Sequence, residues 1–130
     1  MIIDASAIIA IIREEADALA YADAIEAARF CYISAATFVE IAAVVDPNPN
    51  PLLRLRFDEL MTVGDIEIVP VSIEQSRIAR AALSNFGKGS GHPARLNFGD
   101  SFSYALSKSW RMPLLFNGND FSQTDIESAL

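Results

Sequence analysis

Cysteine and histidine are nearly absent from this chain of 130 residues, which contains one of each, Cys31 and His92. A single cysteine excludes an internal disulfide and every multi-cysteine zinc site. Cys31 lies in the apolar segment "RFCYIS", where we expect a small core residue. His92 lies in the loop "GKGSGHPARLN", and a nucleophilic Cys–His pair is disfavoured because this loop would have to reach a buried strand. A bound metal ion would depend mainly on carboxylates, which favours Mg²⁺ or Mn²⁺ over Zn²⁺.

Long hydrophobic runs and a surplus of positive charge are also missing. No apolar run reaches the roughly 18 residues that a membrane-spanning helix needs. The run "ASAIIAII" lacks the preceding positive charge and the following cleavage site of a signal peptide, so we expect a cytoplasmic protein with no membrane partner. The formal net charge of −7 disfavours a nonspecific nucleic-acid binder, but it leaves open an enzyme that reaches phosphates through metal ions.

Hydrophobic residues make up 52% of the chain, which is enough to bury a core within a single domain over residues 1–130. Short apolar segments alternate with segments of helical periodicity, and this alternation predicts an α/β domain with a mostly parallel central sheet. We expect strands at 1–4, 30–34, 66–71 and 112–116. Helices are expected over 5–28 in two pieces, 35–45, 52–64, 73–87 and 96–110. Ser34 and Ser72 precede two of these segments and are suited to cap them.

Asp4 follows the apolar strand "MII" and precedes an apolar helix start. Open α/β sheets place ligand-binding groups at the carboxyl ends of buried parallel strands. An aspartate at this position can also cap the next helix, and we favour the ligand-binding role over that alternative.

Glu40 has only small or apolar neighbours on its helix, and the rest of that helix is apolar too. This composition predicts a helix buried on all sides. A buried and unpaired carboxylate is costly, so Glu40 should be protonated, paired or bound to metal. The alternative is an ion pair with a single arginine.

Asp100 lies in the first turn of the helix "LNFGDSFSYALSKSW", where its charge alone is worth under about 1 kcal/mol. Beside it on the same side are Ser103 and Ser107, small residues that we expect to leave room for a ligand. The opposite side is predicted to be a buried apolar stripe of Phe98, Phe102, Ala105, Leu106 and Ser109.

Asp120 follows the last predicted strand, in "LLFNGND". Gly118 and Asn119 make a plain turn as good an interpretation of this stretch as a ligand-binding role for Asp120. The carboxyl ends of parallel strands meet at one edge of a sheet, so Asp4 and Asp120 can converge there, and helices beginning at that edge can add Glu40 and Asp100. Clustered carboxylates repel one another unless a cation is bound or some are protonated. Divalent metal ions held by clustered carboxylates catalyse the hydrolysis of phosphodiesters.

The order of these acids resembles the PIN domain and, more narrowly, the VapC-type toxins of bacterial toxin–antitoxin pairs. The resemblance covers nearly the whole chain and rests on "MIIDASAII", "ISAATFVEIAAVV", "LNFGDSFSYALSK" and "PLLFNGNDFSQTDI". It implies a three-layer α/β/α fold and a Mg²⁺- or Mn²⁺-dependent endoribonuclease that hydrolyses RNA. It also implies a homodimer and a cognate VapB-type antitoxin that blocks the active site.

Carried over residue by residue, the resemblance implies that Asp4, Glu40, Asp100 and Asp120 are catalytic. Asp4 and Asp100 would be the most direct metal ligands, and Glu40 would act as a ligand, through water, or by orienting the attacking water. Ser6 would support the site by hydrogen bonding.

The fourth acid departs from the family pattern. Many relatives carry Thr-x-Asp after the last strand, and here that register falls on Asn117 or Gly118. Asp120 comes slightly later and would act through water, and whether it or Asn119 completes the site stays open. RNA phosphates would be contacted by cations such as Lys108, Arg111 or Arg95.

Other functions fit the same residues. They are a DNA-directed metal nuclease, a non-catalytic PIN-like module for RNA binding or dimerisation, and an α/β domain whose acids are only caps and ion pairs. The lack of a long basic insertion counts against the first of these. The presence of all three core acids counts against the second, and Glu40 counts against the third.

Overall fold

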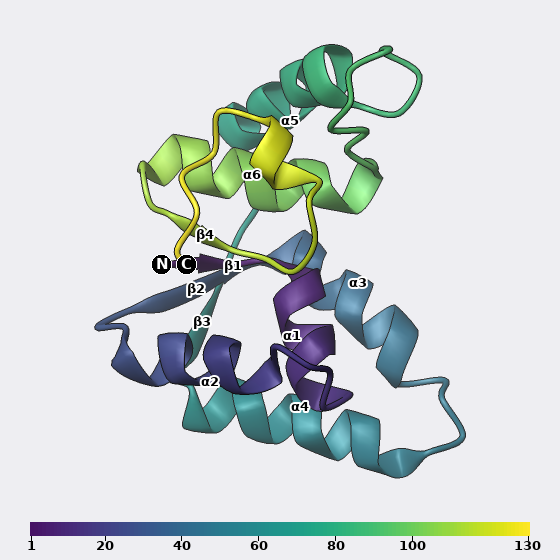
Figure 1. The fold of residues 1–130 in the computed structure, drawn as a ribbon, viewed down its shortest axis with the longest axis vertical. Helices are drawn as coiled ribbons and strands as arrows, with labels where there is room; N and C mark the ends of the chain where they lie inside the picture. The colour runs from purple at the N-terminus through teal and green to yellow at the C-terminus, as the bar shows by residue number, and fades with distance from the viewer.

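Four short parallel strands form the centre of the structure, a computed structural model that describes residues 1–130 (Figure 1). The strand order across the sheet is β3-β2-β1-β4, and every pairing is parallel, as the sequence predicts. The strands are β1 (Ile2–Ile3), β2 (Cys31–Ser34), β3 (Ile66–Val69) and β4 (Leu114–Leu115).

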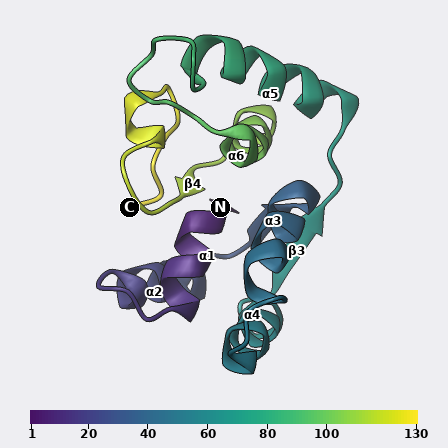
Figure 2. The same cartoon turned by 90° about the vertical axis from the view of Figure 1, so that its right-hand side faces the viewer.

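Helices cover both faces of this sheet, which gives the three-layer α/β/α arrangement (Figures 1 and 2). In the view of Figure 1, α5 and α6 lie above the sheet, α1, α2 and α4 lie below it, and α3 lies at one side. The helices are α1 (Ala5–Ile12), α2 (Ala18–Ala27), α3 (Ala35–Val45), α4 (Pro51–Val63), α5 (Ile73–Phe86) and α6 (Phe98–Trp110), and a 3₁₀ turn, η1 (Phe121–Gln123), follows β4. No helix combines the length and the apolar character that crossing a membrane requires.

Short polar side chains begin most of these helices. Ser34 caps α3 and Ser72 caps α5, as the sequence predicts, and each hydroxyl accepts a hydrogen bond from a backbone N–H of the first turn. Asn50 caps α4 in the same way, with Pro51 in the first position, where a missing N–H costs nothing. The predicted break within residues 5–28 is also present, and Glu14 adopts a positive φ of 55° there.

The core has one apolar cluster on each side of the sheet. Ile3, Ile33 and Leu115 belong to the cluster beneath α1 and α3, whereas Ile2 and Leu114 belong to the cluster beneath α6. Successive residues of a strand point to opposite faces, so both residues of β1 are buried. Coverage of both faces explains why β1 and β4 are apolar at both positions, whereas the edge strand β3 has exposed Glu67 and Ile68.

The prediction that α3 is buried on all sides is wrong. It packs against α1, α4 and α6 with Thr37, Ile41 and Val45 buried, but Val39 on its outer face is 62% exposed. An apolar composition does not reveal which side of a helix lacks a neighbour. Glu40 is accordingly half-buried rather than enclosed.

The two predicted sides of α6 are also partly wrong. Phe98, placed in the buried stripe, is 73% exposed, whereas Ser103 and Ser107 are buried. Ser103 Oγ lies 3.2 Å from Thr37 Oγ1 on α3, and Ser107 Oγ donates to the carbonyl of Met112 over 2.6 Å. These small residues therefore permit close packing and leave no room for a ligand.

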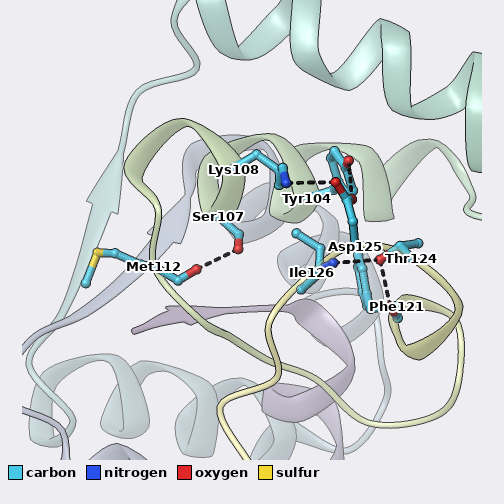
Figure 3. A network of polar contacts seen from close by, with 8 residues as sticks. All are labelled: Tyr104, Ser107, Lys108, Met112, Phe121, Thr124, Asp125 and Ile126. Carbon is cyan, nitrogen blue, oxygen red and sulfur yellow. Dashed lines mark hydrogen bonds and ion pairs between the residues drawn. The ribbon is translucent and has the colours of Figure 1, made fainter.

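A polar network fastens the segment after β4 onto α6 (Figure 3). Asp125 accepts a hydrogen bond of 2.7 Å from the hydroxyl of Tyr104 and forms an ion pair of 2.8 Å with Lys108. Within the segment, the hydroxyl of Thr124 donates to the carbonyl of Phe121 and accepts from the N–H of Ile126. The hydrogen bonds from Lys108 and Tyr104 lower the pKa of Asp125, so this network persists at neutral pH.

Candidate active site

A cleft of about 260 Å³ lies at the carboxyl edge of the sheet, and all four predicted acids line it. Asp4 ends β1, Glu40 lies on α3, Asp100 lies in the first turn of α6, and Asp120 follows β4. The remaining lining residues are Ala5, Ser6, Ile9, Ile41, Val44 and Asn97. The cleft thus has a carboxylate-rich wall and an apolar wall contributed by α1 and α3.

Asp4 caps α1 and is 3% exposed. Its Oδ2 accepts hydrogen bonds from the N–H of Ser6 over 2.9 Å and from the hydroxyl of Ser6 over 2.6 Å. Its Oδ1 is buried without a partner, and no other buried side-chain polar atom lacks one. An unsatisfied buried acceptor costs about 1–3 kcal/mol, so capping accounts for one oxygen of Asp4 and leaves the other unexplained.

Asp100 forms a reciprocal capping box with Asn97. The N–H of Asn97 donates to Asp100 Oδ2 over 2.8 Å, and the N–H of Asp100 donates to Asn97 Oδ1 over 2.9 Å. Burial raises the pKa of Asp100 to about 6, the hydrogen bond from Asn97 opposes this rise, and the charges of Asp4 and Asp120 add to it. Asp100 therefore helps to cap α6 and also presents a carboxyl group of raised pKa to the cleft.

Glu40 accepts no hydrogen bond, and none of the three ion pairs in the structure includes it. The alternative of a pairing arginine is therefore not realised. Burial, and then the charges of Asp4 and Asp100, raise the pKa of Glu40 to about 7. Near neutral pH its carboxyl group exchanges readily between the protonated and ionised forms, as a general base requires.

The acids share a cleft without forming a closed ligand shell. No group of three or more His, Cys, Asp or Glu side chains is spaced to hold a metal ion in this conformation. The unpaired Oδ1 of Asp4 and the raised pKa values of Glu40 and Asp100 are nevertheless what a cation would relieve. The donors are all oxygens, which suits Mg²⁺ or Mn²⁺.

Gly99 lies directly against the carboxyl group of Glu40, and any Cβ at position 99 would collide with it. We expect Gly99→Ala to push Glu40 out of the cleft and to lower catalytic activity about a hundredfold, because a displaced group loses its alignment. The clashing atoms are the end of a flexible side chain, so the melting temperature should change little. Catalytic activity and thermal unfolding should be measured on the same samples. Wild-type activity in Gly99→Ala would show that Glu40 has no role.

Of the other residues considered from the sequence, some lie at the cleft and others do not. Ser6 lies beside Asp4, and exposed Asp120 reaches the cleft, whereas Asn119 does not line it. The side chain of Asn117 turns away and binds Tyr21 and Glu15. His92 lies outside the cleft, where its Nδ1 accepts the N–H of Ala94.

The cations near the cleft differ from those expected. Lys108 is paired with Asp125, and with Arg111 it lies around the far end of α6. Lys88 instead lowers the pKa of Asp100 through its charge, although it does not line the cleft. The spacing of Asn97 and Asp100 is a capping-box pattern that sequence reasoning missed. No local sequence pattern indicates this effect of Lys88, because the bridge between Gly87 and Leu96 sets the course of its loop.

Comparison with known proteins shows similarity to PIN domain ribonucleases over nearly the whole chain. The PIN domain family model matches residues 1–127. The chain is 50% identical to VapC ribonuclease Mb0625 of Mycobacterium bovis and to Ribonuclease VapC28 of Mycobacterium tuberculosis, over 100% of its own length and 98% of theirs. It is 41% identical to Ribonuclease VapC42 of Mycobacterium tuberculosis, over 99% of its own length and 98% of that protein.

Proposed function

Because this chain belongs to the PIN domain family and matches VapC ribonucleases along its whole length, we propose that it is a Mg²⁺- or Mn²⁺-dependent endoribonuclease, the toxin of a VapBC-type pair. The observation that carries this proposal is the cleft shared by four carboxylates, one of which keeps a buried oxygen without a partner. In an acidic protein, such a cleft gives access to phosphates once a cation is bound.

Each acid has a distinct task in the proposed reaction. Asp4 and Asp100 would hold the metal ion, since both are fixed by hydrogen bonds that leave one oxygen free for the cleft. When bound, the ion would supply an activated water and neutralise charge on the phosphate. Glu40, with a pKa of about 7, would orient the attacking water and accept its proton. Asp120, exposed at the rim, would act through water.

Two protein partners follow from the same proposal, a second copy of the chain and a VapB-type antitoxin. Apolar side chains exposed on α4 support such contacts, namely Leu52, Leu55 and Val63. Val63 lies about three turns beyond Leu52, so the spacing places these side chains along one face of α4. Apolar side chains that gather on one exposed face are typical of interaction surfaces.

The proposal is tested with purified protein freed from any bound antitoxin. We expect it to cut a structured RNA pool in the presence of Mg²⁺ or Mn²⁺, and to stop cutting when EDTA is added. DNA of the same sequences serves as the matched substrate. Preferential cutting of DNA would favour a DNA-directed nuclease. Cutting that survives EDTA would contradict the metal centre.

A further inference from the structure

A chain of hydrogen bonds runs from α2 to Asp4 behind the cleft. The hydroxyl of Tyr21 donates to Asn117 Oδ1 over 3.0 Å, and Asn117 Nδ2 donates to Glu15 Oε2 over 3.2 Å. The backbone N–H of Asn117 donates to Ser6 Oγ over 2.9 Å, and Ser6 Oγ donates to Asp4 Oδ2 over 2.6 Å. Asn117 thus joins a buried tyrosine outside the cleft to the hydroxyl that orients Asp4.

Asn117 sits where the chain needs such an anchor. The strand before it, β4, has only two residues, so the sheet holds the chain for a short distance. Gly118 follows with a φ of 96°, and a glycine in this conformation adds flexibility to the turn. That turn leads directly to Asp120 at the cleft. The two side-chain bonds of Asn117 therefore anchor the start of this short segment.

Tyr21 supplies the more protected of these two bonds. Its side chain is 7% exposed, whereas Glu15 is exposed and its hydrogen bond competes with water. Tyr21 does not line the cleft, so its hydroxyl has no direct access to substrate. Any effect of this hydroxyl on the reaction must pass through Asn117.

We propose that Tyr21 is a positioning residue, which holds Asn117 so that its backbone N–H binds Ser6 and Ser6 orients Asp4. The inference rests on the proposed function, because positioning matters only if these acids act in catalysis. It assigns to α2, which contributes no residue to the cleft, control over the geometry inside it.

The test removes the hydroxyl alone, with Tyr21→Phe, and compares it with Tyr104→Phe. Tyr104 is a matched control, because it is 6% exposed and its hydroxyl also makes one side-chain hydrogen bond, to Asp125 (Figure 3). We expect Tyr21→Phe to lower kcat and Mn²⁺ affinity by about tenfold, as loss of an outer partner of a metal ligand does. KM and the melting temperature should match those of Tyr104→Phe, which should keep wild-type kcat and Mn²⁺ affinity.

A double-mutant cycle shows whether the effect passes through Ser6. Tyr21→Phe added to Ser6→Ala should cause little further loss, because the connection is already cut. Asn117→Ala, which keeps the backbone N–H but removes both side-chain bonds, should reproduce Tyr21→Phe if that variant folds poorly. Backbone amide NMR shifts of Ser6 should move in Tyr21→Phe and stay in place in Tyr104→Phe.

The outcomes separate this inference from the proposed function. If the wild type cleaves RNA and the two tyrosine variants behave alike, or the double mutant is fully additive, the positioning role is wrong and the nuclease stands. If the wild type neither cleaves RNA nor binds Mn²⁺, the proposed function fails and the inference fails with it.

Discussion

Asp4→Asn and Asp100→Asn should each lower the rate of RNA cleavage about a hundred- to a thousandfold while the protein remains folded. Each substitution removes a negative charge from the cleft but retains a side-chain oxygen. Asparagine caps a helix about as well as aspartate, and its amide oxygen can still accept the bonds that Ser6 and Asn97 now donate. The loss should therefore be chemical rather than structural.

The measurement is the single-turnover cleavage rate in Mn²⁺, with thermal unfolding of the same samples. Asp58→Asn on the exposed face of α4 is the matched control and should keep full activity. A calorimetric Mn²⁺ titration of both cleft variants should show weakened binding. Normal cleavage by either cleft variant would remove that residue from the metal centre.

Cleavage should rise about a thousandfold between pH 5 and pH 7.5, as two carboxyl groups with raised pKa values both become ionised. These groups are Asp100, with a pKa of about 6, and Glu40, with a pKa of about 7. Protons and metal compete for the same oxygens, so a higher Mn²⁺ concentration should move the profile to lower pH. A profile that is flat over this range would show that neither group must lose a proton.

The stability of the metal-free protein should change in the opposite direction. Asp100 and Glu40 retain protons in the folded state at pH values where the unfolded chain, with ordinary pKa values of 3.8 and 4.5, has released them. The free energy of unfolding therefore falls as pH rises from about 4 to about 7 and levels off above that.

Glu40→Gln isolates the contribution of one residue to this dependence. At pH 8 it should stabilise the metal-free protein by about 1–2 kcal/mol, a value discounted because Glu40 is partly exposed. The same variant should lose RNA cleavage. Urea unfolding at pH 5 and pH 8, with and without Mn²⁺, measures this stabilisation, and the cleavage assay measures the loss of activity. Equal stabilisation at the two pH values would contradict the raised pKa of Glu40.

The sequence was sufficient to predict the alternation of elements and the parallel sheet, because local periodicity and strand composition carry that information. It also indicated which acids would meet, since Asp4 and Asp120 follow strands whose carboxyl ends share an edge. Ser34 and Ser72 marked helix starts through capping chemistry alone. Each of these signals lies within a few neighbouring residues.

The features that the sequence did not reveal depend on which surfaces meet in three dimensions. Val39 and Phe98 are apolar but exposed, whereas Ser103 is polar but buried against Thr37. The contact of Tyr21 with Asn117 spans 96 positions, a separation over which no periodic pattern operates. Lys88 affects Asp100 from a loop whose path is set by tertiary pairing.

The order in which the ribosome makes this chain has a consequence for the proposed toxin activity. β1 takes its place inside the sheet only when β4, near the end of the chain, pairs with its open edge. Asp4 and Glu40 emerge early, whereas Asp100 and Asp120 emerge with that final section. A nascent or prematurely terminated chain therefore carries half of the acids and an unfinished sheet. The proposed activity would begin only after β4 and Asp120 have been translated, which gives a co-translated inhibitor time to be present first.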